Sequence, residues 1–276
     1  MASYNEISVQ SLYRLIGTPE CPTILDVRID EDFEQDPQLI PTARRHSYAD
    51  VSSLKDELQN CSVIVCCQKG LKLSQGAAAV LRNLGIQAEV LEGGHLAWAQ
   101  AGLPLVNVDK IPTEQDTDQH HGGYLWVTKQ RPKIDRIACP WLIRRFVDPQ
   151  AQFLFVANSQ VLNVAERFNA TPFDVEDVFY THREEKCTFD TMLEEFGLKT
   201  PALERLATIV RAADTNQHDL APQAAGLLAI SIGLSRVYRD DLEQLDAGLL
   251  IYDSLYRWAR DASEEGHDWP QHQKGK

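Results

Sequence analysis

The sequence predicts an α/β domain with a parallel sheet flanked by helices, followed by a mostly α-helical domain with a few strands. In the first part of the chain, short β-type runs alternate with stretches of helical spacing. Such alternation is typical of βαβ units joined by right-handed crossovers. Later in the chain, helical spacing dominates. The predicted boundaries are 1–108 for the first domain, 109–123 for a linker and 124–276 for the second domain.

Each element of the first domain has a local signal. The run 23–27 predicts a strand, and the continuously apolar run 62–67 predicts one buried on both faces. Apolar residues then recur at helical spacing over 73–84, and Gly85 is a natural end for that helix. A further strand at 87–91 leads through two glycines, which favour a tight turn, into a helical segment.

The linker and the second domain are marked by composition and by helix start signals. Residues 109–123 have almost nothing to bury, so the linker histidines His120 and His121 are expected to be solvated. Strands are expected at 124–128 and 152–156. The N-terminal signals Thr188 and Thr200-Pro201 predict the next two helices. From 223 to about 262 helical spacing continues, and the possible breaks or close-packing points are Gly226, Gly233 and Gly248.

Composition excludes several classes of protein. The net charge of −13 disfavours nucleic-acid binding over the whole surface. The longest nearly unbroken apolar run, 225–234, is about half as long as a membrane helix, and no signal peptide is recognisable. Six cysteines are too sparse for a disulfide scaffold in a chain of this length. A cytoplasmic protein without nucleic-acid or membrane partners is therefore expected.

Cys67 is the strongest candidate nucleophile. The buried strand leads directly into the loop 68–72 and then into a helix, which puts Cys67 where active sites of open α/β sheets lie. A turn at Gly70 can direct backbone N–H groups to one point, and Lys69 and Lys72 add positive charge. These features lower the pKa of a thiol, and the thiolate is the nucleophile. The alternative is that Cys67 only ends a buried strand.

The segment CQKGLKLS, residues 67–74, resembles the active-site loop C-x-x-G-x-[RK] of single-domain rhodaneses. Three further stretches match that family in the same order: LDVR at 25–28, IPTAR at 40–44 and LEGGHLAW at 91–98. The resemblance covers about residues 5–107. It implies that Cys67 carries sulfane sulfur as a persulfide, without any cofactor, between a small-molecule donor and a thiol acceptor. The residues implied to bind substrate are Gln68, Lys69, Gly70, Leu71 and Lys72.

The same resemblance assigns supporting roles and leaves one point open. It implies that Asp26 and Arg28 are scaffold residues. Family members often carry arginine where Lys72 stands, and lysine cannot clamp an oxyanion with two parallel hydrogen bonds, so the donor is undetermined. Phosphatase-type loops have the spacing C-x5-R, which neither Cys66 nor Cys67 satisfies. Cys66 is expected to point to the opposite face of its strand.

Basic residues concentrate early in the second domain: Arg131, Lys133, Arg136, Arg144 and Arg145. A solvated helix face packed on its apolar side is the simpler interpretation. The alternative is an anion site for chromate or sulfate formed by Arg131, Arg136, Arg144 and Arg145. Metal-ligating residue types are scattered without a local signature. If a divalent metal is bound, His182 and Asp214 are the expected ligands.

Residues 124–270 resemble the C-terminal domain of ChrB-type chromate-resistance proteins. The matching stretches are WVT at 126–128, RPKIDRIACPWLIRRF at 131–146, CTFD at 187–190, IVRAAD at 209–214 and HDWP at 267–270. The two resemblances imply a sulfurtransferase, using thiosulfate or a related donor, that is coupled to chromate or oxyanion resistance. One alternative is a redox or chromate/metal sensor-regulator to which the rhodanese-like part supplies thiol input. A catalytically silent interaction module is disfavoured by the intact Cys67.

Overall fold

A five-stranded parallel sheet forms the centre of the first domain in the computed structural model, which describes residues 5–112 and 123–266. Its strands, in spatial order, are β1 (Glu6–Ile7), β6 (Gln87–Leu91), β5 (Ser62–Cys66), β2 (Thr23–Asp26) and β4 (Arg44–Arg45). A separate antiparallel pair joins β3 (Gln38–Leu39) to β7 (Val106–Asn107). The predicted linker histidines and the HDWP motif lie outside the described residues.

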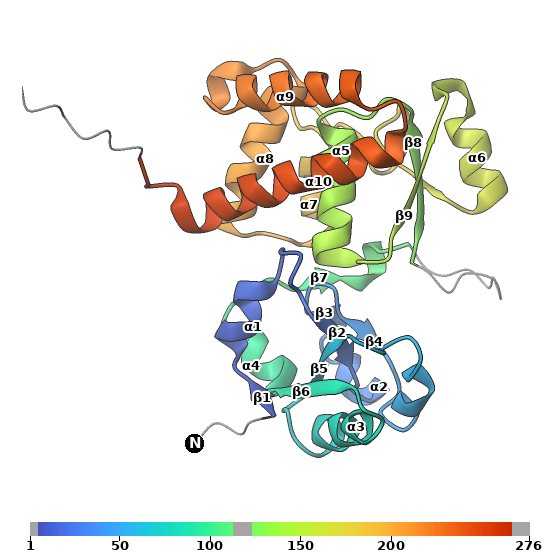
Figure 1. Ribbon diagram of the computed structural model, residues 1–276, viewed down its shortest axis with the longest axis vertical. Helices are drawn as coiled ribbons and strands as arrows, with labels where there is room; N and C mark the ends of the chain where they lie inside the picture. The colour runs from blue at the N-terminus through green and yellow to red at the C-terminus, as the bar shows by residue number, and fades with distance from the viewer. Residues whose placement is uncertain (1–4, 113–122, 267–276) are drawn as a thin grey trace, which may run out of the picture.

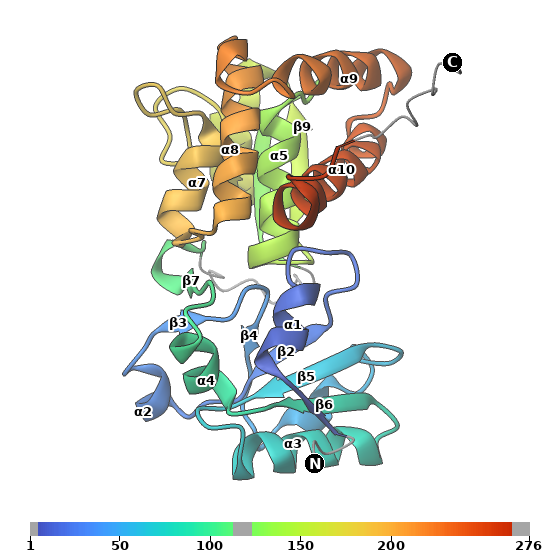
Figure 2. The ribbon, with the colours of Figure 1, turned by 90° about the vertical axis from the view of Figure 1, so that its left-hand side faces the viewer.

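Helices cover both faces of this sheet, as the βαβ pattern predicts (Figures 1 and 2). They are α1 (Val9–Leu15), α2 (Asp30–Phe33), α3 (Lys72–Asn83) and α4 (Gly94–Gln100), with short 3-10 turns η1 (Val51–Leu54) and η2 (Val108–Lys110). The side chains of β5, and of Cys67 directly after it, alternate between two cores. Ile64 and Cys66 face the core that includes α1 and α4, whereas Val63, Val65 and Cys67 face the core that includes α3. This alternation follows from the period of two in a β-strand.

The second domain is mostly helical with a small parallel sheet, also as expected. Its strands lie in the order β10 (Thr171–Pro172), β8 (Leu125–Lys129) and β9 (Gln152–Val156). Its helices are α5 (Asp135–Leu142), α6 (Val161–Phe168), α7 (Thr188–Phe196), α8 (Pro201–Asp214), α9 (Ala224–Val237) and α10 (Asp241–Arg257). Single turns are η3 (Ile143–Val147) and η6 (Trp258–Ala262), both π-helical, and η4 (Asn158–Gln160) and η5 (His218–Leu220), both 3-10.

The long helical stretch near the end of the chain is interrupted, but not at a glycine. The interruption lies between α9 and α10, where the Asp240 side chain accepts hydrogen bonds from the N–H groups of Leu242 and Glu243 at 2.9 and 3.0 Å. An N-cap of this kind satisfies donors that the first helical turn leaves free. Gly248 is a close-packing point instead, because a Cβ there would lie 2.6 Å from the side chain of Ile137.

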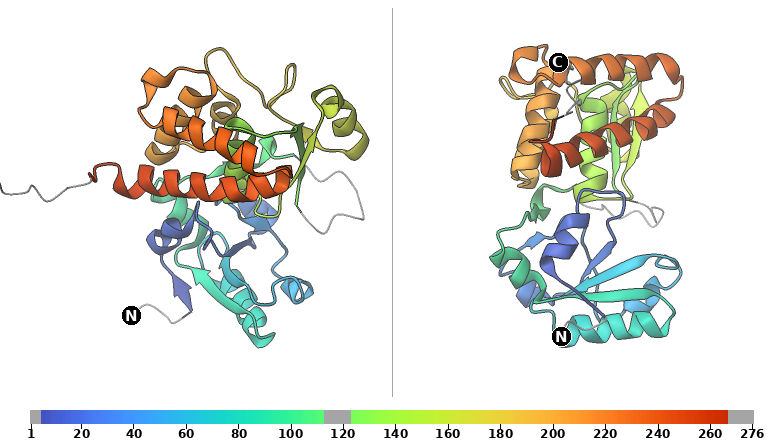
Figure 3. Two further views of the ribbon diagram at one scale, coloured as in Figure 1. Left: turned by 45° about the horizontal axis from the view of Figure 1, so that its top comes forward. Right: turned by 60° about the vertical axis from the view of Figure 1, so that its left-hand side comes forward.

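The two domains lie directly against each other (Figure 3), and one apolar core includes residues of both. Gly17, after α1, has a φ of +76°, and a Cβ there would lie 2.5 Å from the Phe146 ring and 2.6 Å from the Tyr256 ring. The N–H of Thr42 donates to the Phe146 carbonyl at 2.9 Å. The domains are therefore packed against each other directly, and not only joined by the linker. No helix within residues 5–112 or 123–266 has the length and apolar character needed to cross a bilayer.

Candidate active site

Cys67 follows β5 directly and lies at the carboxyl edge of the parallel sheet, just before α3. The strand ends there because the chain turns at Gly70, whose φ is +67°. Two N–H groups near the start of α4 hold the loop from the other side. The N–H of His95 donates to the Cys67 carbonyl at 3.0 Å, and that of Leu96 donates to the Gln68 carbonyl at 3.1 Å.

Glycine is required on both sides of this contact. A Cβ on Gly70 would lie 2.5 Å from the Leu91 carbonyl oxygen, and a Cβ on Gly94 would lie 2.2 Å from the Cys67 carbonyl oxygen. Gly93 and Gly94 also have φ values of +69° and +62°, which favour glycine. The glycine turn predicted from the sequence is therefore the support on which the cysteine loop rests.

The Cys67 sulfur is set up to ionise. Burial raises the pKa of the thiol, but the Ser74 hydroxyl and the backbone N–H groups of Ser74, Lys69 and Leu71 more than offset this, so that the pKa is lowered. The hydroxyl oxygen of Ser74 lies 3.2 Å from Cys67 Sγ. Hydrogen bonds to a thiolate stabilise it over the neutral thiol. The loop can thus stabilise negative charge on the cysteine sulfur.

In the structure, hydrogen bonds give the thiolate more support than the lysine charges that the sequence suggests. Lys69 and Lys72 are exposed, with no ion pair to any described residue, while Ser74 is fully buried against the sulfur. Because exposed charges are screened by water, the short-range hydrogen bonds carry more weight than the lysine charges. Ser74 lies in the CQKGLKLS segment, but its contact with the sulfur depends on the helical turn between them, so the sequence pattern alone does not indicate its role.

A buried ion pair supports the strand end beside Cys67. Arg28 Nη2 lies 2.6 Å from the Asp26 carboxylate, and the Arg28 N–H donates to the same carboxylate at 2.9 Å. The guanidinium also donates to the carbonyl oxygens of Asp36 and Gln38 at 3.0 and 2.7 Å. Removing either charge would leave the other buried and unpaired. The scaffold role predicted for Asp26 and Arg28 agrees with these contacts.

The remaining thiols have environments that oppose ionisation or lack such support. Burial raises the pKa of Cys66 well above its ordinary value, and its side chain lies on the sheet face opposite Cys67. Burial likewise raises the pKa of Cys21, Cys139 and Cys187. Buried thiols of this kind are poor nucleophiles. Cys67 is therefore the cysteine that the structure favours for chemistry.

The four arginines considered for an anion site contact separate partners in the fold. Each guanidinium has its own partner. Arg131 donates to Ser235, Arg136 pairs with Asp174, Arg144 with Asp246 and Arg145 with Asp253. Two of the bonds from Arg145 to Asp253 measure 2.8 and 2.9 Å. Arg136 in α5 and Arg144 and Arg145 in η3 connect these elements to other parts of the fold, which agrees with the simpler interpretation of a packed helix face; the anion site stays a prediction.

His182 and Asp214, far apart in the sequence, do come together. Nε2 of His182 lies 3.2 Å from Asp214 Oδ2, 3.4 Å from Asp174 Oδ1 and 3.5 Å from Asp135 Oδ2. The Asp174 and Asp214 carboxylates raise the pKa of His182 to about 10. Burial, with Asp214 and Asp174 nearby, raises the pKa of Asp135. Asp135 was not predicted as a partner because it lies 47 residues before His182, whereas Asp174 lies only eight residues before His182 but in no local motif that links the two.

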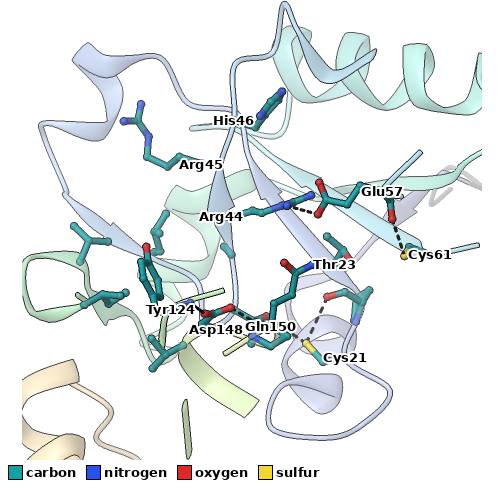
Figure 4. Close-up of a pocket in the computed structure, with 18 of the residues that line it drawn as sticks. Cys21, Thr23, Arg44, Arg45, His46, Glu57, Cys61, Tyr124, Asp148 and Gln150 are labelled. Carbon is teal, nitrogen blue, oxygen red and sulfur yellow. Dashed lines mark hydrogen bonds and ion pairs between the residues drawn. The ribbon is translucent and has the colours of Figure 1, made fainter. Parts of the chain in front are cut away.

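A cavity of about 690 Å³ lies between the domains, and neither Cys67 nor His182 lines it. Figure 4 shows side chains that line this cavity. Its lining includes Thr23 and Cys61, at the amino ends of β2 and β5, and Tyr124 and Gln150 from the second domain. Cys67 stands at the opposite, carboxyl end of the sheet and does not line the cavity. We therefore assign this cavity no part in the chemistry of Cys67.

Comparison with known proteins agrees with both resemblances. Family models match the rhodanese-like domain at residues 8–101 and the ChrB C-terminal domain at residues 126–259. Protein ChrB of Cupriavidus metallidurans is 34% identical over 156 residues, which are 56% of this chain and 46% of that protein. A sulfurtransferase of Allochromatium vinosum is 27% identical over 103 residues, covering 37% of this chain and 94% of that protein.

Among solved structures, a rhodanese-related protein from Thermoplasma volcanium is 27% identical, with a TM-score of 0.33. The match covers 38% of this chain and 99% of that one. The chain spans about half the length of the ChrB protein that it matches. The two family matches follow one another without overlap, and they fall on the α/β sheet and on the helical part described above. The chain thus joins a segment that matches the rhodanese-like domain to a segment that matches the ChrB C-terminal domain.

Proposed function

We propose that this protein is a sulfurtransferase that forms a persulfide on Cys67 and passes the sulfane sulfur to a thiol acceptor, and that this reaction serves chromate or related oxyanion resistance in the cytoplasm. The observation that carries the proposal is the Ser74 hydroxyl, 3.2 Å from a sulfur whose pKa is lowered. A thiolate held by hydrogen bonds at the edge of a parallel sheet is suited to nucleophilic attack.

The reaction has two displacement steps. In the first, the Cys67 thiolate attacks the outer sulfur of thiosulfate, the S–S bond of the donor breaks, and sulfite leaves with the bonding electron pair. In the second, an acceptor thiolate attacks the terminal sulfur of the persulfide. A new persulfide forms on the acceptor, and the Cys67 thiolate is regenerated. No external oxidant or reductant is consumed, so the cycle needs no cofactor.

The residues of the loop have distinct roles in this cycle. The backbone N–H groups of Lys69, Leu71 and Ser74, which lower the pKa of the resting thiol, can also stabilise the terminal charge of the persulfide. The exposed side chains of Lys69 and Lys72 attract an anionic donor from solution. Gly70 gives the loop the close approach to the β6–α4 turn that fixes these amides in place.

Mass spectrometry of the full chain after incubation with thiosulfate tests the proposal. We expect one added sulfur atom on the tryptic peptide that contains Cys67, and its loss on addition of an acceptor thiol. Cys67→Ser should abolish both, because a hydroxyl oxygen cannot form a persulfide. Cys61→Ser, in the same domain but with no stabilising loop, is the matched control and should retain turnover. Wild-type turnover in Cys67→Ser would show that the nucleophile is another residue.

The link to oxyanion resistance rests on the ChrB C-terminal domain and on thiol chemistry. Chromate oxidises thiols, so a protein that restores or carries reduced sulfur is useful where chromate enters the cell. Complementation of a chromate-sensitive strain tests the link. The wild-type gene should restore growth on chromate, and Cys67→Ser should not. Equal rescue by both would separate the resistance function from sulfur transfer.

A sensor-regulator is the second candidate, and the shared core of the two domains favours it. In such a protein, modification of Cys67 would alter the second domain rather than drive turnover. The two candidates differ in stoichiometry. A sulfurtransferase releases many equivalents of sulfite per chain with an acceptor thiol present, whereas a sensor reacts once.

A further inference from the structure

A second group of reactive side chains lies in the ChrB-family domain, away from the Cys67 loop. It consists of Asp135 at the start of α5, His182 in the loop before α7, and Asp214 at the end of α8. One ligand atom from each of the three lies within 4.8 Å of the other two. Nothing in the sulfur-transfer reaction uses these residues, which converge from three separate parts of the chain.

The distances within the group suit metal coordination better than an ion pair. Nε2 of His182 is 3.2, 3.4 and 3.5 Å from three carboxylate oxygens. Charge-assisted hydrogen bonds are shorter, about 2.7–2.9 Å, and one N–H can point at only one oxygen. Ligand atoms about 2.1 Å from a tetrahedral or octahedral ion lie roughly 3.0–3.4 Å apart, which is close to the 3.2 and 3.5 Å that separate His182 Nε2 from the Asp214 and Asp135 oxygens.

A buried oxygen without a partner provides an independent argument. The Asp135 side chain is 1% exposed, and its Oδ2 accepts a hydrogen bond from the Thr188 N–H at 2.6 Å. Its other oxygen, Oδ1, is buried and has no hydrogen-bond partner among the described residues. A buried carboxylate oxygen left unpaired is costly. A cation held by this carboxylate would remove that cost.

Asp214 supplies a third argument. It is the last residue of α8, where the partial negative charge of the helix end disfavours a carboxylate. It pairs with His182, and no arginine or lysine among the described residues pairs with it. An acidic residue at this position weakens the helix unless a positive charge lies next to it. A bound cation would supply more positive charge than a single imidazolium.

Asp174 has a different role, because it is already paired. It lies 3.3 Å from Arg136 Nε and 3.8 Å from Lys129 Nζ, and it accepts a hydrogen bond from Thr188 Oγ1 at 2.9 Å. Thr188 therefore bridges Asp135 and Asp174 through its N–H and its hydroxyl. Contacts of this kind orient the ligands of a metal site. Asp174 is a positioning residue in this arrangement.

We propose that Asp135, His182 and Asp214 bind a divalent first-row transition-metal ion, such as Mn²⁺ or Zn²⁺. Two carboxylates balance the charge of the ion, and the imidazole favours a transition metal over Mg²⁺ or Ca²⁺. The site is open on one side, since the side chains of His182 and Asp214 are 40% and 20% exposed. The remaining coordination positions face solvent and are free for water or an oxyanion.

Electron paramagnetic resonance of Mn²⁺ titrated into the full-length, chelator-treated protein tests the site. The signal of free Mn²⁺ should fall until one ion is bound per chain. Zn²⁺ should displace the ion, and Mg²⁺ should not. Asp214→Asn and His182→Gln should each weaken binding by tenfold or more. The matched controls Asp219→Asn, five residues further on, and His46→Gln, in the first domain, should leave it unchanged.

Two further measurements identify the metal ligands even if a variant is less stable than the wild type. Circular dichroism verifies the fold of each variant before titration. In the wild-type protein with Mn²⁺ bound, electron spin-echo modulation should contain a nitrogen coupling from a directly bound imidazole, and this should disappear in His182→Gln. The proposal is overturned if neither Mn²⁺ nor Zn²⁺ binds the wild type. It is also overturned if folded Asp214→Asn and His182→Gln bind as the wild type does, or if Mg²⁺ competes as strongly as Zn²⁺.

Discussion

Replacing Ser74 with alanine is expected to slow sulfur transfer by raising the pKa of the Cys67 thiol. The Ser74 hydroxyl lies 3.2 Å from Cys67 Sγ and donates to the Leu71 carbonyl at 3.1 Å. A protonated Cys67 can donate to the Ser74 oxygen while that second bond remains. A thiolate cannot donate, so the single hydroxyl proton has to turn from the Leu71 carbonyl to the sulfur.

The stabilisation of the thiolate by Ser74 can be worked out from this exchange of one hydrogen bond for another. A hydrogen bond to a charged group contributes about 1.5–3 kcal/mol, and the neutral bond to the carbonyl that is given up contributes about 0.5–1.5 kcal/mol. The net stabilisation of the thiolate is therefore roughly 1–1.5 kcal/mol, which corresponds to about a tenfold change in the thiolate population below the pKa. The backbone N–H groups of the loop remain in the variant, so part of the lowered pKa should persist.

Alkylation of Cys67 by a small reagent, followed by mass spectrometry as a function of pH, measures the effect. Only the thiolate reacts, so the rate rises as the pH passes upward through the pKa. The lowered pKa of the wild type brings this rise to lower pH than for an ordinary thiol, and Ser74→Ala should move it back to higher pH. The two proteins should react alike at high pH, where both are ionised.

A matched control separates the thiol from the helix. Ser53 donates to the Asp50 carbonyl at 2.7 Å, a bond of the same local type made far from any catalytic group. Ser53→Ala should lose a similar capping bond without moving the profile. An unchanged alkylation profile in folded Ser74→Ala would refute the assignment of the hydroxyl to the thiolate.

Three further substitutions test the loop and the domain contact. Gly94→Ala should destabilise the protein by roughly 1–3 kcal/mol from backbone strain alone and abolish sulfur transfer. The control Gly76→Ala, in the open interior of α3, should instead stabilise the protein by about 0.5–1 kcal/mol. Urea unfolding measures both changes. Gly17→Ala should lower the free energy of unfolding clearly more than Gly102→Ala does, because both glycines have a positive φ but a Cβ has room only at Gly102. An equal loss of stability in the two variants would contradict direct packing between the domains. Lys72→Ala should raise the KM for thiosulfate less than tenfold, and added salt should erase the difference if the role is electrostatic attraction.

Elements with a strong local pattern were predictable from the sequence. The strand β6 and the strand β9 have the predicted bounds, and α3 is shifted by a single residue from the prediction. The two-residue strands are too short to show a period of two. They exist because of their neighbours, as β10 does through its pairing with β8. The helix α6 (Val161–Phe168) also escaped prediction, although its apolar residues have helical spacing, because eight residues make only about two turns and repeat that spacing too few times to stand out.

The two candidate sites also differ in how far each could be predicted from the sequence. The Cys67 loop is encoded within eight consecutive residues, so its motif could be read directly from the chain. The group around His182 is assembled from residues 135, 174, 182 and 214, and spacing alone could not identify the set. For the arginines, the sequence shows where the positive charge lies but not what it contacts. Their charge suggested an anion site, but charge density along a chain does not reveal which acidic side chains the fold brings to each arginine.

One continuous helical segment links the second-domain group to the first domain. Asp135 begins α5 beside His182, and the same segment ends in η3 at Phe146 and Val147. At that end, the Phe146 ring contacts Gly17 and its carbonyl accepts the Thr42 N–H at 2.9 Å. Such a packed segment is stiff, because protein interiors are as dense as organic crystals. Asp135 therefore lies at one end of a packed helical segment whose other end is buried in the domain interface, so the two domains are connected by packed structure and not only by the linker.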